Sequence, residues 1–173
     1  LKARELALDL DQLNQTRKEI EAGMKLEALE ICQNLTALFK ELPSGITLYQ
    51  PDWHQGVLGI VSSRIKEQYH RPVIAFAKDG EGVLKGSARS IEGLHMRDVL
   101  ERIHSQHPNM ILKFGGHAMA AGLSLREEHF DDFQHIFNQT VVDWLDEEHL
   151  QGVIWTDGEL NSNEFNLETA ELI

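Results

Sequence analysis

Residues 73–89 read VIAFAKDGEGVLKGSAR, and this stretch decides the fold class. The continuous apolar run over 73–77 predicts a strand that is buried on both faces. Asp79-Gly80-Glu81-Gly82 predicts a turn, and a second strand is predicted over 83–89. Outward from this pair, the patterns predict a strand over 46–49, a one-faced helix over 56–69 and a helix over 96–105. Strands and helices alternate through 46–145, which predicts an α/β domain with one main sheet.

The later part of this region predicts two short strands, over 111–114 and 122–125, on either side of a glycine-rich segment. Ser124 and Glu127 fit a capping box, which predicts the start of a helix. Behind them lies an aromatic and aliphatic stripe with helical spacing, which predicts a core-facing helix: Phe130, Phe133, Phe137, Val141 and Trp144.

The two ends of the chain carry helical patterns that are cut short. Residues 3–24 form a stripe close to a heptad, Gly23 is expected to weaken or kink it, and a second helical stretch follows to residue 39. A strand is predicted over 151–160 and a helix from 163 to 173. Because the chain opens at Leu1 and closes at Ile173 inside such patterns, we expect it to be a piece of a longer protein.

The formal net charge is −12, which at first argues against a nucleic-acid binder. The charge is unevenly divided, however. Residues 1–42 have a net charge of −2, residues 43–126 of +3, and residues 127–173 of −13 without a single Lys or Arg. An anion site is therefore expected in the middle section, and the acidic tail is interpreted as a solvated face.

Composition excludes several other classes of protein. The chain has no apolar run long enough for a membrane span and no secretory leader pattern, and we expect a cytoplasmic protein. Its single cysteine, Cys32, excludes an internal disulfide and is expected to be buried rather than reactive. His104 and His107 could share a helical face, but Pro108 follows and no metal-binding motif accompanies them, so they are interpreted as surface histidines.

Two segments of the middle section are candidates for binding an anion. Ser87 and Arg89 point to the same face of the predicted strand, and a hydroxyl beside a guanidinium suits a phosphate. In Gly115-Gly116-His117 the glycines permit close backbone approach and an anion-binding nest, and the histidine adds a donor. The structural alternatives are a solvated arginine at a strand end and a tight turn with a satisfied histidine.

Weaker candidates lie in and beside the first predicted helix of this region. His54 precedes a helix N-terminus that contains small residues and would favour an anion, and Arg64 lies on that helix. The alternative is that His54 only caps the helix.

Taken together, four segments resemble the DHHA1 domain of the DHH phosphoesterase superfamily. They are WHQGVLGIVSSR (53–64), RPVIAF (71–76), KGSARS (85–90) and FGGHAMAAGLSL (114–125). The stretches GLHMRDVLERI (93–103) and LQGVIWTDGEL (150–160) favour the single-stranded-DNA-specific 5′-to-3′ exonucleases within that superfamily. The resemblance covers the whole chain: connector helices over 1–42, a DHHA1 domain over 43–149 and the start of an OB-type domain over 150–173.

The resemblance implies a mixed central sheet flanked by helices and a part in DNA repair and recombination. Single-stranded DNA is the implied substrate, and a helicase and a single-strand-binding protein are implied partners. Ser87 and Arg89 would contact the phosphate at the DNA 5′ end. Gly115, Gly116 and His117 would line the catalytic cleft, with His54 and Arg64 as weaker contacts.

The sequence also departs from the superfamily, because it contains no Asp-His-His triplet. The two Mn²⁺ or Mg²⁺ ions of such enzymes would be bound by a DHH domain outside this chain, and the chain alone is expected to hold no metal and to be inactive. Two alternatives stay open. One is a related phosphoesterase acting on short oligonucleotides or cyclic dinucleotides, and the other is a non-catalytic nucleic-acid-binding or protein-binding module.

Overall fold

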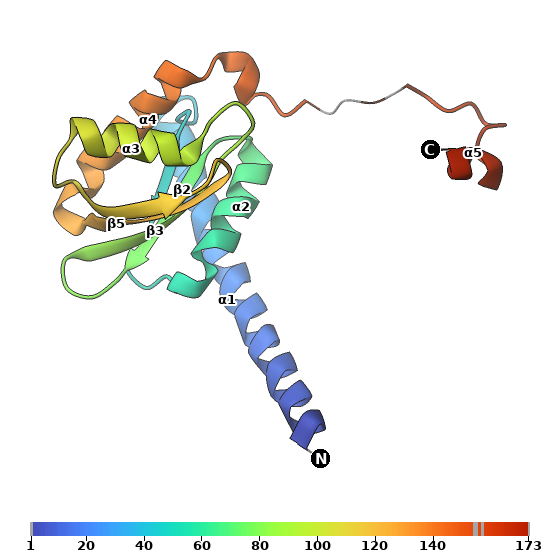
Figure 1. Ribbon diagram of the computed structural model, residues 1–173, viewed down its shortest axis with the longest axis horizontal. Helices are drawn as coiled ribbons and strands as arrows, with labels where there is room; N and C mark the ends of the chain where they lie inside the picture. The colour runs from blue at the N-terminus through green and yellow to red at the C-terminus, as the bar shows by residue number, and fades with distance from the viewer. Residues whose placement is uncertain (1, 154–155, 157, 173) are drawn as a thin grey trace.

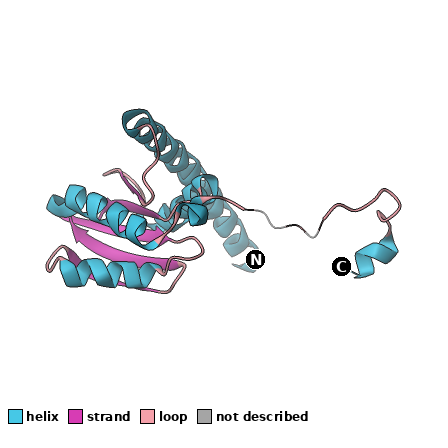
Figure 2. Cartoon of the chain, turned by 90° about the horizontal axis from the view of Figure 1, so that it is seen from above, coloured by secondary structure: helices cyan, strands magenta, loops and turns pink. Residues whose placement is uncertain are grey.

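The computed structural model describes residues 2–153, 156 and 158–172. It begins with one helix of 38 residues, α1 (Lys2–Phe39), whose N-terminal half extends away from the rest of the chain in Figure 1. Figure 2 shows the same helix from above. The predicted division into two helical stretches at Gly23 is wrong, because α1 is one continuous helix. A side chain at this position would meet nothing within 4 Å, and the helix continues because the next turns bury Met24, Ala28 and Cys32 against the body.

Five strands form one mixed sheet in the order β1-β2-β3-β5-β4. β1 (Ile46–Tyr49) pairs in parallel with β2 (Val73–Lys78), and all the other pairs are antiparallel. The antiparallel strands are β3 (Val83–Arg89), β4 (Ile111–Gly116) and β5 (Ala120–Arg126). The two strands predicted around the glycine-rich segment are therefore longer than expected, because the glycines themselves are part of the β4–β5 ladder.

Helices cover the two faces of the sheet. α2 (Leu58–Tyr69) follows a short 3-10 turn, Gln55–Val57, and packs with α1 on one face over β1 and β2. α3 (Met96–Gln106) and α4 (Phe130–Trp144) pack on the other face. The helices predicted over 56–69 and 96–105 are thus confirmed to within two residues. α2 ends where His70 adopts a left-handed conformation with φ of 50°, just before Pro72.

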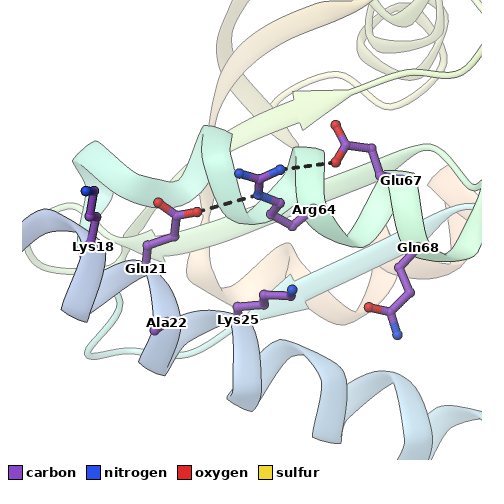
Figure 3. A pocket seen from close by; sticks show the side chains of 7 residues that line it. All are labelled: Lys18, Glu21, Ala22, Lys25, Arg64, Glu67 and Gln68. Atoms are coloured by element: carbon purple, nitrogen blue, oxygen red, sulfur yellow. Dashed lines mark hydrogen bonds and ion pairs between the residues drawn. The ribbon is translucent and has the colours of Figure 1, made fainter.

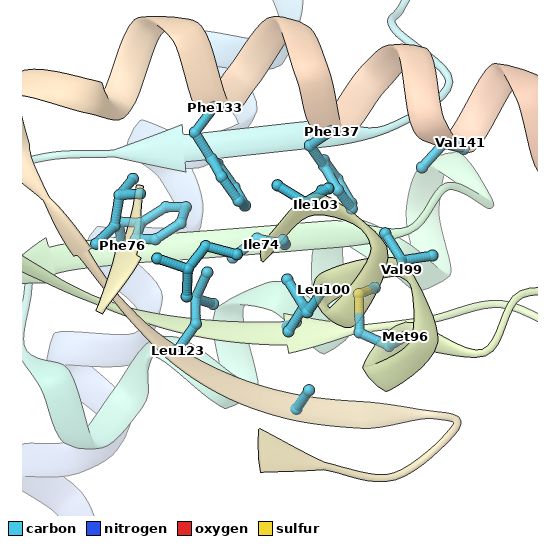
Figure 4. Close-up of a cluster of buried hydrophobic side chains, with 14 of the residues drawn as sticks. Ile74, Phe76, Met96, Val99, Leu100, Ile103, Leu123, Phe133, Phe137 and Val141 are labelled. Carbon is cyan, nitrogen blue, oxygen red and sulfur yellow. The ribbon is translucent and has the colours of Figure 1, made fainter. Parts of the chain in front are cut away.

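The buried core is divided by the sheet into two clusters. In β2, Ile74 and Phe76 point into the α3–α4 cluster, whereas Val73, Ala75 and Ala77 point into the α1–α2 cluster. This confirms the predicted strand buried on both faces. Figure 4 shows the α3–α4 cluster, in which the rings of Phe133 and Phe137 from α4 lie over the sheet.

The capping box predicted at Ser124 and Glu127 is wrong. Ser124 lies inside β5, and α4 begins only at Phe130 after a 3-10 turn without a side-chain cap. The carboxylate of Glu127 instead accepts a hydrogen bond from the Tyr49 hydroxyl at 2.9 Å and pairs with Lys78 Nζ at 3.3 Å. The predicted core stripe of α4 is confirmed for Phe133, Phe137 and Val141. Trp144 at its end stays 37% exposed beside the Arg102 guanidinium.

Beyond α4, a 3-10 turn (Glu147–Leu150) folds back onto the body. Arg71 donates to the carbonyl of Leu150, and burial lowers the pKa of this guanidinium. The strand predicted over 151–160 includes residues 154, 155 and 157, which lie outside the described residues, and the other residues of this stretch form no strand. The helix predicted from 163 is seen as α5 (Leu167–Leu172). Within the described part of the chain, no helix has the length and apolar character that a bilayer crossing requires.

Candidate functional site

The candidate site lies on the face of the sheet that carries α1 and α2, where β3, β5 and β4 continue past these helices. Leu84 and Ala88 of β3 point into the α3–α4 cluster, so the alternating residues Lys85, Ser87 and Arg89 point to the opposite face. On β4 and β5 this face is floored by two paired and exposed glycines, Gly115 and Gly122.

The side chains of Ser87 and Arg89 meet, as the sequence predicted. Arg89 Nη1 lies 3.4 Å from Ser87 Oγ and donates to the carbonyl of Ala88 at 2.9 Å. The same pair lies against α2, because a methyl group at Gly59 would stand 2.6 Å from Arg89 Nη2 and 3.1 Å from Ser87 Oγ. Gly59 therefore makes the space in which the guanidinium folds back over the strand.

Among the described residues, the Arg89 guanidinium has no acidic partner. It is half-buried, and none of the ion pairs formed by the described residues includes it. A partly desolvated cation is normally paired, and a guanidinium whose outer N–H groups face no carboxylate suits an oxyanion ligand. The geometry thus favours the hypothesis that Arg89 binds an anion over the alternative that it is a solvated arginine at a strand end.

The first turn of α2 adds a second source of positive potential beside this arginine. Gly59 is the second residue of α2, and the residue that caps the helix, Val57, offers no side-chain hydrogen bond. The N-terminal amides of a helix carry a partial positive charge of roughly half a unit. A phosphate next to the guanidinium would therefore also lie near the helix end that attracts anions.

The two glycines before His117 have different reasons to be glycine. Gly116 adopts a φ of 146°, and a side chain there would lie 2.5 Å from the carbonyl oxygen of Ala120. Gly115 has no positive φ, and a side chain there would meet nothing within 4 Å. Gly116 is thus required by the hairpin itself, whereas Gly115 leaves a bare patch on the surface.

His117 lies at the tip of the β4–β5 hairpin with an exposed side chain. Its backbone N–H donates to the carbonyl of Ala120 at 2.8 Å, so this amide cannot contribute to the predicted anion nest. The tip is fixed by two backbone hydrogen bonds, from Ser90 N–H to Met119 and from Met96 N–H to Ala118. The imidazole is therefore presented on a well-anchored loop and remains available to a ligand.

The weaker candidates lie apart from this group. His54 accepts a hydrogen bond from the Gly56 amide through Nδ1 at 3.1 Å, so it caps the 3-10 turn, as the structural alternative held. Arg64 lies in a hollow between α1 and α2, where Figure 3 shows its guanidinium between two carboxylates. The distances are 3.6 Å to Glu21 and 3.5 Å to Glu67, so its charge is already balanced.

Sequence reasoning missed residues that the sheet register brings to the same face. Lys113 lies on β4 opposite Ser124, and Gly122 lies opposite both Ser87 and Gly115. The signal was present, because alternate residues of three strands are polar or glycine. It could be used only once the pairing of the strands was known.

The described residues contain no group of three or more His, Cys, Asp and Glu side chains that could hold a metal ion. His104 packs against the ring of Phe114, with centroids 5.4 Å apart. Cys32 is buried, as predicted, and burial raises the pKa of its thiol to about 12. The donors that the fold gathers beside Arg89 have the chemistry that suits an anion.

Comparisons with known proteins agree with the fold and the motifs. Residues 35–143 match the DHHA1 domain family. The chain is 94% identical over 172 residues to the single-stranded-DNA-specific exonuclease RecJ of Haemophilus influenzae, covering 99% of this chain and 30% of that protein. It is 58% identical over 171 residues to the RecJ exonuclease of Escherichia coli K12, again covering 30% of that protein. The chain thus spans about a third of the length of these curated relatives.

A solved structure supports the same assignment. The crystal structure of RecJ in complex with Mn²⁺ from Thermus thermophilus aligns with a TM-score of 0.70 at 30% identity, covering 83% of this chain and 20% of that one. This similarity confirms the predicted mixed α/β fold with a long N-terminal helix. The family match covers more than half of the chain and includes every segment of the candidate site, so this chain belongs to the DHHA1 domain family.

Proposed function

We propose that this chain is the DNA-binding part of a single-stranded-DNA-specific 5′-to-3′ exonuclease. The whole enzyme would act in DNA repair and recombination in the cytoplasm. The observation that carries the proposal is the Arg89 guanidinium, half-buried beside Ser87 and without an ion pair among the described residues. The proposal is supported by relatives that are named single-stranded-DNA-specific exonucleases and that match this chain along nearly its whole length.

In this function, Arg89, Ser87 and the first turn of α2 together bind the phosphate at the DNA 5′ end. The guanidinium supplies parallel N–H donors, the Ser87 hydroxyl supplies another, and the first turn of α2 adds its partial charge. The donors are held in place by the fold, since Ser62 Oγ donates to the Ser87 carbonyl at 2.8 Å and ties α2 to β3. The fixed geometry limits the conformational entropy lost on binding.

Gly115 and His117 would contact the same strand closer to the reacting bond. The bare surface at Gly115 lets a phosphate or sugar approach the backbone closely. The exposed His117 imidazole, on its anchored hairpin tip, can donate a hydrogen bond to a phosphate oxygen.

The metal ions of the reaction would come from a part of the enzyme other than this chain. The described residues do not fit a metal centre, because they contain no group of three or more His, Cys, Asp and Glu side chains that could hold a metal ion. Mn²⁺ or Mg²⁺ bound by a DHH domain would activate the attacking water. This chain would position the DNA opposite that centre and would be inactive alone. A helicase and a single-strand-binding protein, which supply single-stranded DNA, are the proposed partners.

The experiment that tests this function uses the full-length protein that carries the chain. It is incubated with single-stranded DNA labelled at the 3′ end, with the same DNA labelled at the 5′ end, and with a blunt duplex, each with Mn²⁺ or Mg²⁺. We expect the 5′ label to be released first as a mononucleotide, the duplex to persist, and EDTA to stop the reaction. Dinucleotides and cyclic dinucleotides are incubated in parallel. Their cleavage, while both labelled single strands persist, would overturn the proposal in favour of a small-substrate phosphoesterase.

A further inference from the structure

A second cationic group lies on the same open face of the sheet, away from Arg89. Lys85 of β3 pairs with Ser124 of β5, and Ser124 pairs with Lys113 of β4. Directly paired residues point to the same face, so these three side chains form one row across three strands. The neighbouring row is Ser87, Gly122 and Gly115, and Arg89 with Ala120 begins the row after that.

The two lysines of this row have no internal role in the described structure. Both are exposed, and no carboxylate of the described residues forms an ion pair with either amine. They border a hollow of about 260 Å³ whose lining includes Ser124, Gly115 and Gly122. The hollow therefore has positive charge on two sides, and Ser124, which is only 4% exposed, lies at its base between the two lysines.

The glycines that separate this row from Arg89 are not explained by the fold. A side chain at Gly115 would meet nothing within 4 Å, and one at Gly122 only the Gly86 carbonyl oxygen at 3.8 Å. Neither glycine has a positive φ. Glycine inside a strand costs stability, by roughly 0.5–1 kcal/mol relative to alanine. Glycines in a strand that no packing contact requires often mark a place where a ligand or another chain approaches the backbone closely.

We propose that Lys85, Ser124 and Lys113 form a second phosphate subsite, which binds an internal phosphate of the same DNA strand whose 5′ end is held at Arg89. This inference rests on the proposed function. Lys85 and Arg89 are four residues apart along β3, about 14 Å in an extended strand, so the two subsites contact different phosphates. The DNA backbone between them lies over Gly122 and Gly115, where no side chain obstructs it.

The test measures DNA affinity of the full-length protein against salt concentration, in EDTA so that no cleavage occurs. The probe is a 3′-labelled single strand with either a 5′-phosphate or a 5′-hydroxyl. In the double variant Lys85→Ala with Lys113→Ala, loss of this one phosphate contact should lower the slope of log affinity against log salt by about 0.7. The preference for the 5′-phosphate should stay unchanged, because Arg89 is intact. The control, Lys18→Ala with Lys25→Ala, makes the same charge change in the hollow between α1 and α2.

A second variant tests the bare floor without changing any charge. Gly122→Ala places a methyl group in open space, so folding should be preserved, while the affinity for the single strand should fall several-fold. An unchanged salt slope in the double-lysine variant, or an equal drop in its control, would overturn the subsite. So would loss of the 5′-phosphate preference together with the slope. If the unsubstituted protein binds no single-stranded DNA, the proposed function itself fails, which separates the two failures.

Discussion

Gly59 of α2 lies directly against the guanidinium of Arg89 on β3, so that a methyl group at position 59 would stand 2.6 Å from Nη2. The helix and the strand approach each other closely at this point, and the space that glycine leaves is filled by the arginine. The position of α2 and the position of the Arg89 guanidinium are therefore linked by the absence of a side chain at residue 59.

The substitution Gly59→Ala should weaken 5′-phosphate binding without unfolding the protein. Alanine favours a helix by about 1 kcal/mol over glycine, and the atom it would strike is the mobile end of a side chain. We expect the melting temperature to stay level or rise, while the affinity advantage of a 5′-phosphorylated strand over a 5′-hydroxyl strand falls several-fold. A variant that keeps the full advantage would show that Arg89 is not held by this contact.

The adjacent glycines at the end of β4 should respond differently to alanine. Gly116→Ala forces a side chain onto a φ of 146° and to within 2.5 Å of a backbone oxygen, which we expect to cost more than about 1 kcal/mol of folding stability. Gly115→Ala should leave the stability level or slightly higher but reduce the affinity for single-stranded DNA. Urea unfolding and anisotropy binding measure the two effects. Equal stability losses in both variants would contradict this division of roles.

A hydrogen bond from Trp53 Nε1 to Glu27 Oε2, 2.7 Å long, helps to hold α1 against the α/β domain. Trp53 is only 5% exposed, so removal of its partner leaves a buried donor unsatisfied. We expect Glu27→Ala to lower the free energy of unfolding by about 1–3 kcal/mol. Glu30→Ala, a matched change at an exposed position of the same helix, should have an effect close to zero in the same urea titration.

Cys32 should resist thiol reagents while the chain is folded. Burial raises the pKa of its thiol from 9.0 to about 12, so at pH 8 almost no thiolate is present and the sulfur is inaccessible. Because the folded state binds this proton more tightly, its stabilising contribution is complete below pH 9 and is lost as the pH rises toward 12. Labelling in buffer and in denaturant checks this. Fast labelling of the native chain at pH 8 would contradict the burial.

Local sequence patterns predicted the helices and strands whose pattern of apolar and polar residues lies within the element itself. The apolar run of β2 and the alternation of β3 predicted both strands, and the same-face placement of Ser87 and Arg89 followed from the two-residue period. The capping box at Ser124 failed because a serine followed by a glutamate also fits the end of a strand. Only the pairing of Ser124 with Lys85 and Lys113 shows that this serine belongs to a strand and not to a helix cap.

Features that depend on contacts distant in sequence could not be predicted. Arg64 is a weaker candidate ligand from the sequence alone, but the packing of α1 on α2 places Glu21, 43 residues away in the chain, beside it. The requirement for glycine at position 59 likewise arises from the approach of α2 to β3. The net charge of the chain likewise did not predict the charge of the open face of the sheet. A net charge of −12 describes the whole chain, whereas the open face of the sheet gathers Lys85, Arg89 and Lys113 without an acidic partner among the described residues.

We propose that Arg89 binds the phosphate at the 5′ end of single-stranded DNA. The most direct measurement compares the affinities of the full-length protein for 5′-phosphorylated and 5′-hydroxyl strands, in EDTA, for Arg89→Ala and for the exposed control Arg97→Ala on α3. Loss of a hydrogen-bonded charge contact of about 1.5–3 kcal/mol corresponds to a drop of about 10- to 150-fold. We predict that Arg89→Ala removes the preference for the 5′-phosphate by such a factor and that Arg97→Ala keeps it. An unchanged preference in Arg89→Ala would contradict the assignment.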